Sequence, residues 1–185
     1  MTIIEEMPKI RKFAYRQEKG DPEYGSCLWA TFLLDTETYT LYIESDCGNH
    51  TYGWTPTPNA ESFIHLMARV GEDYLLRKIA EETEFCYETS KNTTIDNIKD
   101  YFYDEEDIVE KIIEEIDYKE CLGEIQYEPH EFHNALEEIL DQYNTIDSHE
   151  LIEVAMDFTA GAKRIVKIFK EVLQPILKEE CKEDG

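Results

Sequence analysis

An acidic segment, residues 81–157, most constrains how this chain can fold. The segment holds 25 Asp and Glu residues against four lysines, so it carries a net charge of −21, while the whole 185-residue chain carries −24. Like charges three or four residues apart on a helix repel each other, so this density does not follow from solubility alone. We therefore expect amphipathic helices that bury an apolar stripe and expose their acids.

Three stretches of the acidic segment repeat apolar residues at helical spacing. The first covers 105–116, the second follows Pro129, and the third follows an expected N-cap at Asp147 or Ser148. The expected apolar stripes are Ile108, Val109, Ile112, Ile113 and Ile116, then Phe132, Leu136, Ile139, Leu140 and Tyr143, and then Leu151, Ile152, Ala155 and Met156.

The region before the acidic segment shows the pattern of an antiparallel sheet. Residues 27–34 and 39–44 are rich in aromatic and β-branched side chains, and 35–38 between them is typical of a turn. A short further strand is expected at 50–54. Residues 9–16 fit either a helical turn or an edge strand, and we favour the strand. The sequence therefore predicts a meander of three or four strands with one face that needs cover.

Two helices are expected to cover that face. The first, 61–70, has Asn59 or Thr57 as its candidate N-cap, and the second follows Gly71. Both repeat apolar residues at helical spacing, which is what a helix packed on a sheet requires.

A final helix is expected at about 159–180, with Pro175 kinking it or starting a new turn. It carries several cations, so we expect it to pack near the acidic helices and partly neutralise them. The predicted fold class is α+β, with an N-terminal antiparallel meander and its covering helices in 1–80. An acidic helical region, 81–185, is expected to share one core with the first. The cations are Lys163, Arg164, Lys167 and Lys170.

The overall composition indicates a folded, soluble and cytoplasmic protein. Hydrophobic residues make up 42% of the chain, which is enough for a core despite the charge. No apolar run is long enough to span a membrane, and the N-terminus lacks the pattern of a signal peptide. The five cysteines are widely spaced without a CxxC pair, so we expect neither a disulfide framework nor a zinc site.

The charge also limits the class of partner. A surface at −24 repels nucleic-acid backbones and anionic membranes, so we expect direct binding of neither. A basic partner is favoured instead, and proteins that bind nucleic acids are the commonest source of large basic surfaces. The sequence leaves open whether the chain also forms homo-oligomers.

No motif predicts a reaction, so we expect no enzyme activity and no cofactor. The eight glycines form no phosphate loop, and adjacent carboxylates are unremarkable in a chain with 42 acids. His130 and His133 would share a helical face with Glu137, which could contribute to a metal site only with ligands from elsewhere. Cys47 lies in an expected turn and is interpreted as an incidental thiol.

The acidic helices offer a physical mechanism for binding. Carboxylates on one helical face lie about 5–6 Å apart at Cβ, and B-DNA presents one phosphate charge per roughly 1.7 Å of axis. Acidic helices side by side can therefore approximate the field of a duplex. An ordinary solvated acidic face, or adaptation to salt, is the alternative interpretation. The candidate contact residues are Asp104, Glu105, Glu106, Asp107, Glu110, Glu114, Glu115, Glu137, Glu138 and Asp141.

One stretch of the chain resembles small proteins of bacteriophages and integrated mobile elements. The matching motifs are Ser45-Asp46-Cys47-Gly48-Asn49, Tyr52-Gly53-Trp54 and Asp73-Tyr74-Leu75-Leu76-Arg77-Lys78-Ile79, with Cys47 in place of the usual aromatic residue. The resemblance implies a phage origin. Small acidic phage proteins are often counter-defence factors, such as anti-CRISPR and anti-restriction proteins that occupy the nucleic-acid site of a host nuclease.

The leading hypothesis is therefore a non-enzymatic inhibitor whose acidic helices bind the basic channel of a host nuclease, a Cas nuclease first and a restriction enzyme second. A structural or adaptor protein that associates with itself or bridges partners is the second hypothesis. A metal-dependent enzyme that uses His130 and His133 is the third.

Overall fold

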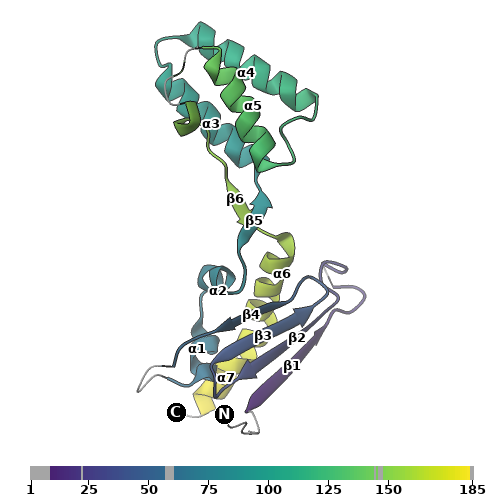
Figure 1. Cartoon of the computed structure of the whole chain (residues 1–185). Coiled ribbons are helices and arrows are strands. Elements are labelled where there is room, and N and C mark those ends of the chain that lie inside the picture. The colour runs from purple at the N-terminus through teal and green to yellow at the C-terminus, as the bar shows by residue number, and fades with distance from the viewer. Residues whose placement is uncertain (1–8, 22, 57–60, 144, 146–147, 184–185) are drawn as a thin grey trace, which may run out of the picture. The chain divides into compact units, whose positions relative to one another are not determined.

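The computed structural model describes residues 9–21, 23–56, 61–143, 145 and 148–183, and it has the predicted α+β fold (Figure 1). The chain divides into two compact units. The first, here called the sheet unit, comprises Met1–Glu81 and Phe158–Gly185. The second, the helical unit, comprises Glu82–Asp157.

The sheet unit is built on the predicted antiparallel meander. Its strands are β1 (Ile10–Arg16), β2 (Trp29–Asp35), β3 (Thr40–Ser45) and β4 (His50–Gly53), and they pair in sequence order. The strand that we favoured at the N-terminus is therefore confirmed. The carboxylate of Asp35 accepts the backbone N–H groups of Glu37 and Thr38 at 3.0 and 3.1 Å, which closes the β2–β3 turn.

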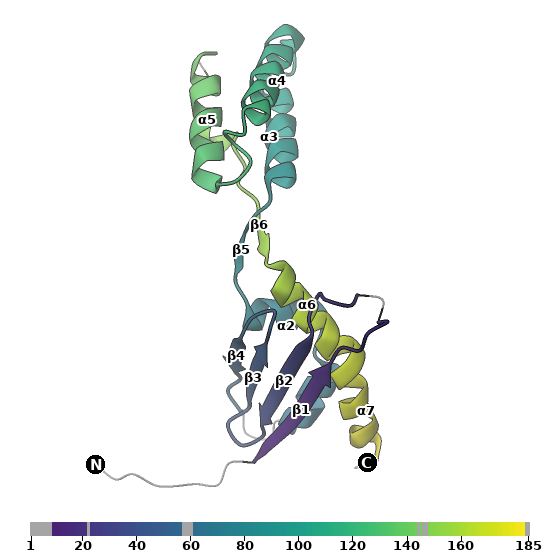
Figure 2. The ribbon, with the colours of Figure 1, turned by 90° about the vertical axis from the view of Figure 1, so that its right-hand side faces the viewer.

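One face of the sheet is covered by four helices. These are α1 (Phe63–Arg69), α2 (Glu72–Ile79), α6 (Ala160–Ile168) and α7 (Gln174–Glu183), and Figures 1 and 2 show α6 and α7 running along this face. The core follows the period-two alternation of the strands. Its buried side chains include Ala30, Phe32, Leu34, Leu41, Ile43, Phe63, Met67, Leu75, Ile165, Phe169, Leu173 and Leu177.

The C-terminal helices lie in a different place from the one we expected. Their apolar face packs in the core of the sheet unit, where the rings of Phe169 and Phe32 are 5.9 Å apart. Their cations pair there too, since Arg164 and Lys167 both bind the carboxylate of Glu23. Lys170 donates to the carbonyl of Val70 in the same unit, so for these three cations the expectation that they neutralise the acidic helices is wrong. The division of the chain also differs from 1–80 and 81–185.

A single π-helical turn, Phe169–Leu173, joins α6 to α7. Pro175 is the second residue of α7, which directly follows this turn, and a proline within a continuous helical run has no N–H to donate to the preceding turn. The predicted change of helical geometry at this proline is confirmed.

Two predicted N-caps fall outside the described residues. They are Thr57 or Asn59 for α1 and Asp147 for the third acidic helix. The described cap of α1 is Ser62, whose hydroxyl oxygen accepts the backbone N–H of His65 at 3.3 Å.

The helical unit consists of α3 (Tyr87–Tyr101), α4 (Glu106–Cys121) and α5 (Pro129–Asp141), together with a two-stranded sheet formed by β5 (Glu82–Phe85) and β6 (Met156–Phe158). The predicted apolar stripes of α4 and α5 face a second core, separate from the first. The buried residues of this core are Ile98, Phe102, Ile112, Ile116, Ile125, Phe132, Ala135, Leu136, Ile139, Leu140 and Ile152.

The third expected acidic helix does not form. A 3₁₀ turn at Ser148–Glu150 is followed by an irregular segment and then by β6. The polar side chains of α3 hold this segment extended. The hydroxyl oxygens of Ser90 and Thr94 accept the backbone N–H groups of Ala155 and Glu153 at 2.9 and 3.0 Å. These bonds replace the backbone bonds that a helix would have made.

The turn after β3 contains an unexpected disulfide. Cys27 and Cys47 are joined, with their Cα atoms 5.7 Å apart. Gly161 packs against this turn so closely that an added Cβ would lie 2.2 Å from the carbonyl oxygen of Cys47. The interpretation of Cys47 as an incidental thiol is therefore wrong, and the expectation of no disulfide framework did not foresee this single pair. Sequence spacing could not reveal a pair that the strand register brings together.

Candidate protein-binding surface

Four consecutive predicted contact residues surround the first turn of α4. Asp104, Glu105, Glu106 and Asp107 are all exposed, and they line a shallow hollow with Tyr103 and Ile108. Carboxylates at a helix N-terminus interact favourably with the helix dipole, so this end can hold the charges at a lower cost than the middle could. None of the four forms an ion pair with another described side chain. Their carboxylates are therefore available to a cationic partner.

Further along α4, the predicted residues differ in their role. Glu110 and Glu114 are exposed. Glu115 is half-buried, and its carboxylate accepts the hydroxyl of Tyr143 at 2.8 Å. This hydrogen bond raises the pKa of Tyr143, with burial as a secondary cause. Glu115 therefore helps to hold the helical unit together.

Two of the three predicted residues on α5 contact other segments of the helical unit. Glu138 is 3.7 Å from Lys119 on the last turns of α4, and Asp141 accepts the Ser148 hydroxyl at 3.2 Å. Glu137 is half-buried. Glu106 and Lys119 are separated by about 20 Å along α4 at 1.5 Å per residue. The structure thus spreads the ten residues from the start of α4 through its middle and onto α5.

An ion-pair network that sequence reasoning missed ties α3 to α4. Lys91 donates to the carboxylates of Asp117 and Glu120, and the Tyr87 hydroxyl donates to Glu120 at 2.8 Å. The bond from Lys91, followed by that from Tyr87, lowers the pKa of Glu120. Burial and the Glu120 carboxylate raise the pKa of Tyr87. Only 16% of the Lys91 side chain is exposed, so this cation serves the fold and not a partner.

The histidines show no metal-binding arrangement within the described part of the chain. His130 is exposed and His133 is half-buried at the start of α5, and neither joins a group of three potential ligands there. Among the described residues, a group of three potential metal ligands is formed by Cys27, Asp46 and Cys47. Metals bind the thiolate form of cysteine, and the disulfide removes it.

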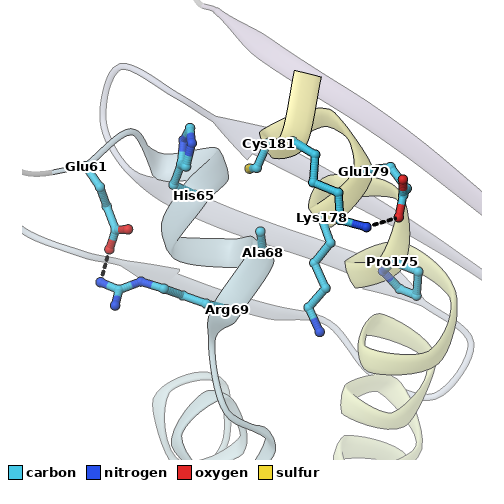
Figure 3. Close-up of a pocket in the computed structure, with 9 residues that line it drawn as sticks. Glu61, His65, Ala68, Arg69, Pro175, Lys178, Glu179 and Cys181 are labelled. Atoms are coloured by element: carbon cyan, nitrogen blue, oxygen red, sulfur yellow. Dashed lines mark hydrogen bonds and ion pairs between the residues drawn. The ribbon is translucent and has the colours of Figure 1, made fainter. Parts of the chain in front are cut away.

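The sheet unit contains an open pocket between α1 and α7, with a volume of about 450 Å³ (Figure 3). Its floor is formed by Ala68, Pro175 and Cys181, and ionic side chains form its rim. Most rim charges are paired with each other, since Glu61 binds Arg69 and Lys182 donates to Glu179 at 2.7 Å. The charged groups of these two pairs are therefore already engaged with each other.

No helix in the described part of the chain is long and apolar enough to cross a membrane.

Comparison with known proteins shows a family but no described activity. No protein of curated function and no solved structure shows significant similarity to the chain. A model of the phage protein family Phage_phiTE_072, described simply as a phage family, matches residues 1–179. This match covers nearly the whole chain, including both units and the motifs between residues 45 and 79. The chain therefore belongs to this phage protein family.

Proposed function

We propose that this phage-family protein is a non-enzymatic counter-defence inhibitor. Its helical unit binds the basic nucleic-acid-binding surface of a host nuclease, with a CRISPR-Cas effector as the first candidate and a restriction enzyme as the second. The inhibitor acts in the cytoplasm of the bacterial host and competes there with DNA or guide RNA.

The observation that carries this proposal is the segregation of charge. The helical unit holds 24 acids and four lysines, a net charge of −20, which leaves −4 for the rest of the chain. Selection for solubility alone would not confine the excess to one unit. The repulsion destabilises the helices that bear it, so we infer a compensating benefit in binding.

The exposed carboxylates at the start of α4 supply the long-range part of the interaction. A strongly charged surface steers an oppositely charged partner into encounter and makes association sensitive to salt. The acids already engaged by Tyr143, Lys119 and Ser148 contribute to the field but are less free to rearrange on binding.

The experiment is retention of host-lysate proteins on immobilised protein at low salt, followed by elution with rising salt. We expect one nuclease to be retained and to be displaced by its own DNA or guide RNA. A fourfold charge reversal on α4 should abolish this retention: Glu106→Lys, Asp107→Lys, Glu110→Lys and Glu114→Lys.

The matched control makes the same change in net charge in the sheet unit. Its substitutions are at exposed acids: Glu18→Lys, Glu44→Lys, Glu72→Lys and Glu171→Lys. This variant should retain the nuclease with only modest weakening. Equal loss in both variants would show that net charge alone is responsible. Retention unaffected by the α4 reversal would refute the proposal.

A self-associating adaptor is the second candidate, favoured by the edge of the sheet. Among the described strands, β1 pairs with β2 alone, so its outer edge has unpaired backbone groups. Concentration-dependent self-association in sedimentation, without any retained nuclease, would favour this role.

A further inference from the structure

The turn that joins α4 to α5 exposes three large side chains. Tyr118 is 65% exposed, Leu122 is 53% exposed and Tyr127 is 72% exposed. Tyr118 and Leu122 are four residues apart at the end of α4, opposite the face that buries Ile112 and Ile116. We call Tyr118, Leu122 and Tyr127 the turn surface.

Leu122 is the member that links the other two, because it follows Tyr118 by one helical turn and shares a hollow with Tyr127. Leu122 and Tyr127 line one hollow together with Asp117 and Glu120. The ring of Tyr127 lies against Gly123, 3.9 Å from the position that a Cβ would occupy. Clustered tyrosine and leucine side chains on an otherwise acidic unit need an explanation that scattered ones would not.

The turn is held rigidly, so the exposure does not come from a loose loop. The N–H groups of Gly123 and Glu124 donate to the carbonyls of Glu120 and Lys119 at 2.9 and 3.1 Å, which is the Schellman pattern of a helix C-terminus. Gly123 has the positive φ of 72° that this pattern requires. Ile125 is fully buried and anchors the turn in the core.

A further bond fixes the second half of the turn. The Gln126 side chain donates to the carbonyl of Glu120 at 3.0 Å. The turn surface is therefore preorganised, and a partner would not have to order it on binding. Rigid exposed aromatic residues of this kind are typical of the centres of protein interfaces.

The charges around the turn surface select a cationic partner. Asp117 and Glu120 line the hollow, and Glu124 follows Gly123 directly. Lys91 pairs with both Asp117 and Glu120, and Lys119 lies 3.4 Å from Glu124, so an incoming cation would share these carboxylates with the two lysines; the unit as a whole remains at −20. The negative field here would repel an anionic partner. A purely apolar partner would cover the carboxylates without pairing them, which is also unfavourable.

Among cations, arginine fits these groups best. A guanidinium group stacks on a tyrosine ring and forms bidentate bonds with a neighbouring carboxylate, whereas a lysine ammonium is a strongly hydrated point charge. We propose that the turn surface binds an arginine-rich segment of a basic protein partner. The proposal takes the basic partner from the proposed function, but it locates the specific contact away from the start of α4.

The test compares an oligoarginine peptide with an oligolysine peptide of equal length, by titration calorimetry with the full-length protein. We expect the wild-type protein to prefer oligoarginine. The double variant Tyr118→Ala/Tyr127→Ala should lose about two- to fivefold of that preference per tyrosine, with its affinity for oligolysine unchanged. Tyr118→Phe/Tyr127→Phe should keep the preference because the ring faces remain.

Tyr24→Ala is the matched control, because Tyr24 is 49% exposed and lies in the sheet unit. It should retain the arginine preference. All these tyrosines are exposed, so circular dichroism should show unchanged helix content. Equal affinity of the wild type for both peptides, or a preference that survives the double alanine variant, would overturn the proposal.

The two proposals fail in different ways. Charge reversal at the start of α4 should weaken both peptides alike, because it removes steering and not stacking. A wild-type arginine preference without any retained nuclease would refute the proposed function and leave the turn surface standing. A retained nuclease without any arginine preference would refute the turn-surface proposal and leave the proposed function standing.

Discussion

The two units of this protein differ in how nearly their acidic and basic side chains balance. In the sheet unit, long-range ion pairs join the strands and loops to the C-terminal helices, as in Arg11 with Glu180 and Lys167 with Glu23 at 2.7 Å each. In the helical unit, four lysines face 24 acids. The comparison teaches that the sheet unit nearly balances its charges and uses some of them to join distant segments, while the helical unit retains an excess of charge that its own fold does not use.

The largest predicted effect tests whether the two cores are energetically separate. Phe132 is fully buried in the helical unit, with its ring centre 5.5 and 5.9 Å from those of Phe85 and Tyr87. Phe132→Ala should lower the free energy of unfolding of that unit by about 3–5 kcal/mol. Calorimetry should show one destabilised transition and one that is unchanged.

Phe169→Ala is the counterpart in the sheet unit, because Phe169 is also fully buried. It should destabilise the other transition by a similar amount. A single transition that both variants shift equally would show that the units unfold as one, and the comparison would then break down.

The second-largest predicted effect comes from the disulfide, which lies in the sheet unit. Cys27 and Cys47 are 20 residues apart, and closing a loop of that length stabilises a fold by about 3 kcal/mol. A reductant should therefore destabilise the sheet unit and leave the helical unit unchanged. Without reductant, the denatured protein should show only the three thiols of Cys86, Cys121 and Cys181. Five reactive thiols before reduction would contradict the assignment.

The Lys91 network should give a smaller effect with a defined pH dependence. Lys91→Met should destabilise the helical unit by about 1–2 kcal/mol, because it leaves two carboxylates without their common cation. Lys99→Met is the control, since Lys99 forms a single exposed pair with Asp96 at 3.5 Å. It should have almost no effect.

The sign of the pH dependence follows from Glu120, whose pKa is lowered in the folded state. Its contribution is fully present above the ordinary pKa of glutamate and is lost as the pH falls through the lowered value. Denaturant unfolding across this acidic range should show a smaller pH dependence in Lys91→Met than in the wild type. An equal pH dependence in the two proteins would exclude this role for the pair.

The smallest predicted effect is that of salt. Screening should relieve repulsion among the exposed acids of α4, so added sodium chloride should stabilise the helical unit by less than about 1 kcal/mol. The sheet unit should gain less, because its net charge is only −4. A stabilisation confined to the sheet unit would contradict the contrast drawn between them.

The sheet was predictable because alternation along a strand directly reports its buried face. Leu41 and Ile43 are buried, whereas Tyr42 and Glu44 point to solvent, as the period-two pattern indicated. The apolar stripes of α4 and α5 were equally clear. In each case the signal lies within one element and does not depend on a distant partner.

The missed elements depend on polar or long-range partners. We did not predict α3, because its buried positions are Ser90, Thr94 and Ile98, and two of these are polar. Those same hydroxyls hold the segment before β6 extended, so one omission explains the wrong helix there. The packing of the final helix on the sheet likewise depends on contacts across the whole sequence.

Individual acids of the candidate surface could be predicted, but their arrangement could not. Exposure of Glu106 and Asp107 follows from helical periodicity. The engagement of Glu115 by Tyr143 and of Glu138 by Lys119 depends on how α4 and α5 pack. The turn surface was missed because three exposed apolar residues in a charged chain have no periodic signal.

Competition with DNA tests the central claim most directly. Cleavage of DNA by the nuclease retained from host lysate should be measured at fixed inhibitor and increasing DNA. We predict that inhibition falls as DNA rises and that the fourfold reversal on α4 abolishes it. Inhibition that persists at saturating DNA, or that survives the reversal, would contradict occupation of the nucleic-acid site by the acidic helices.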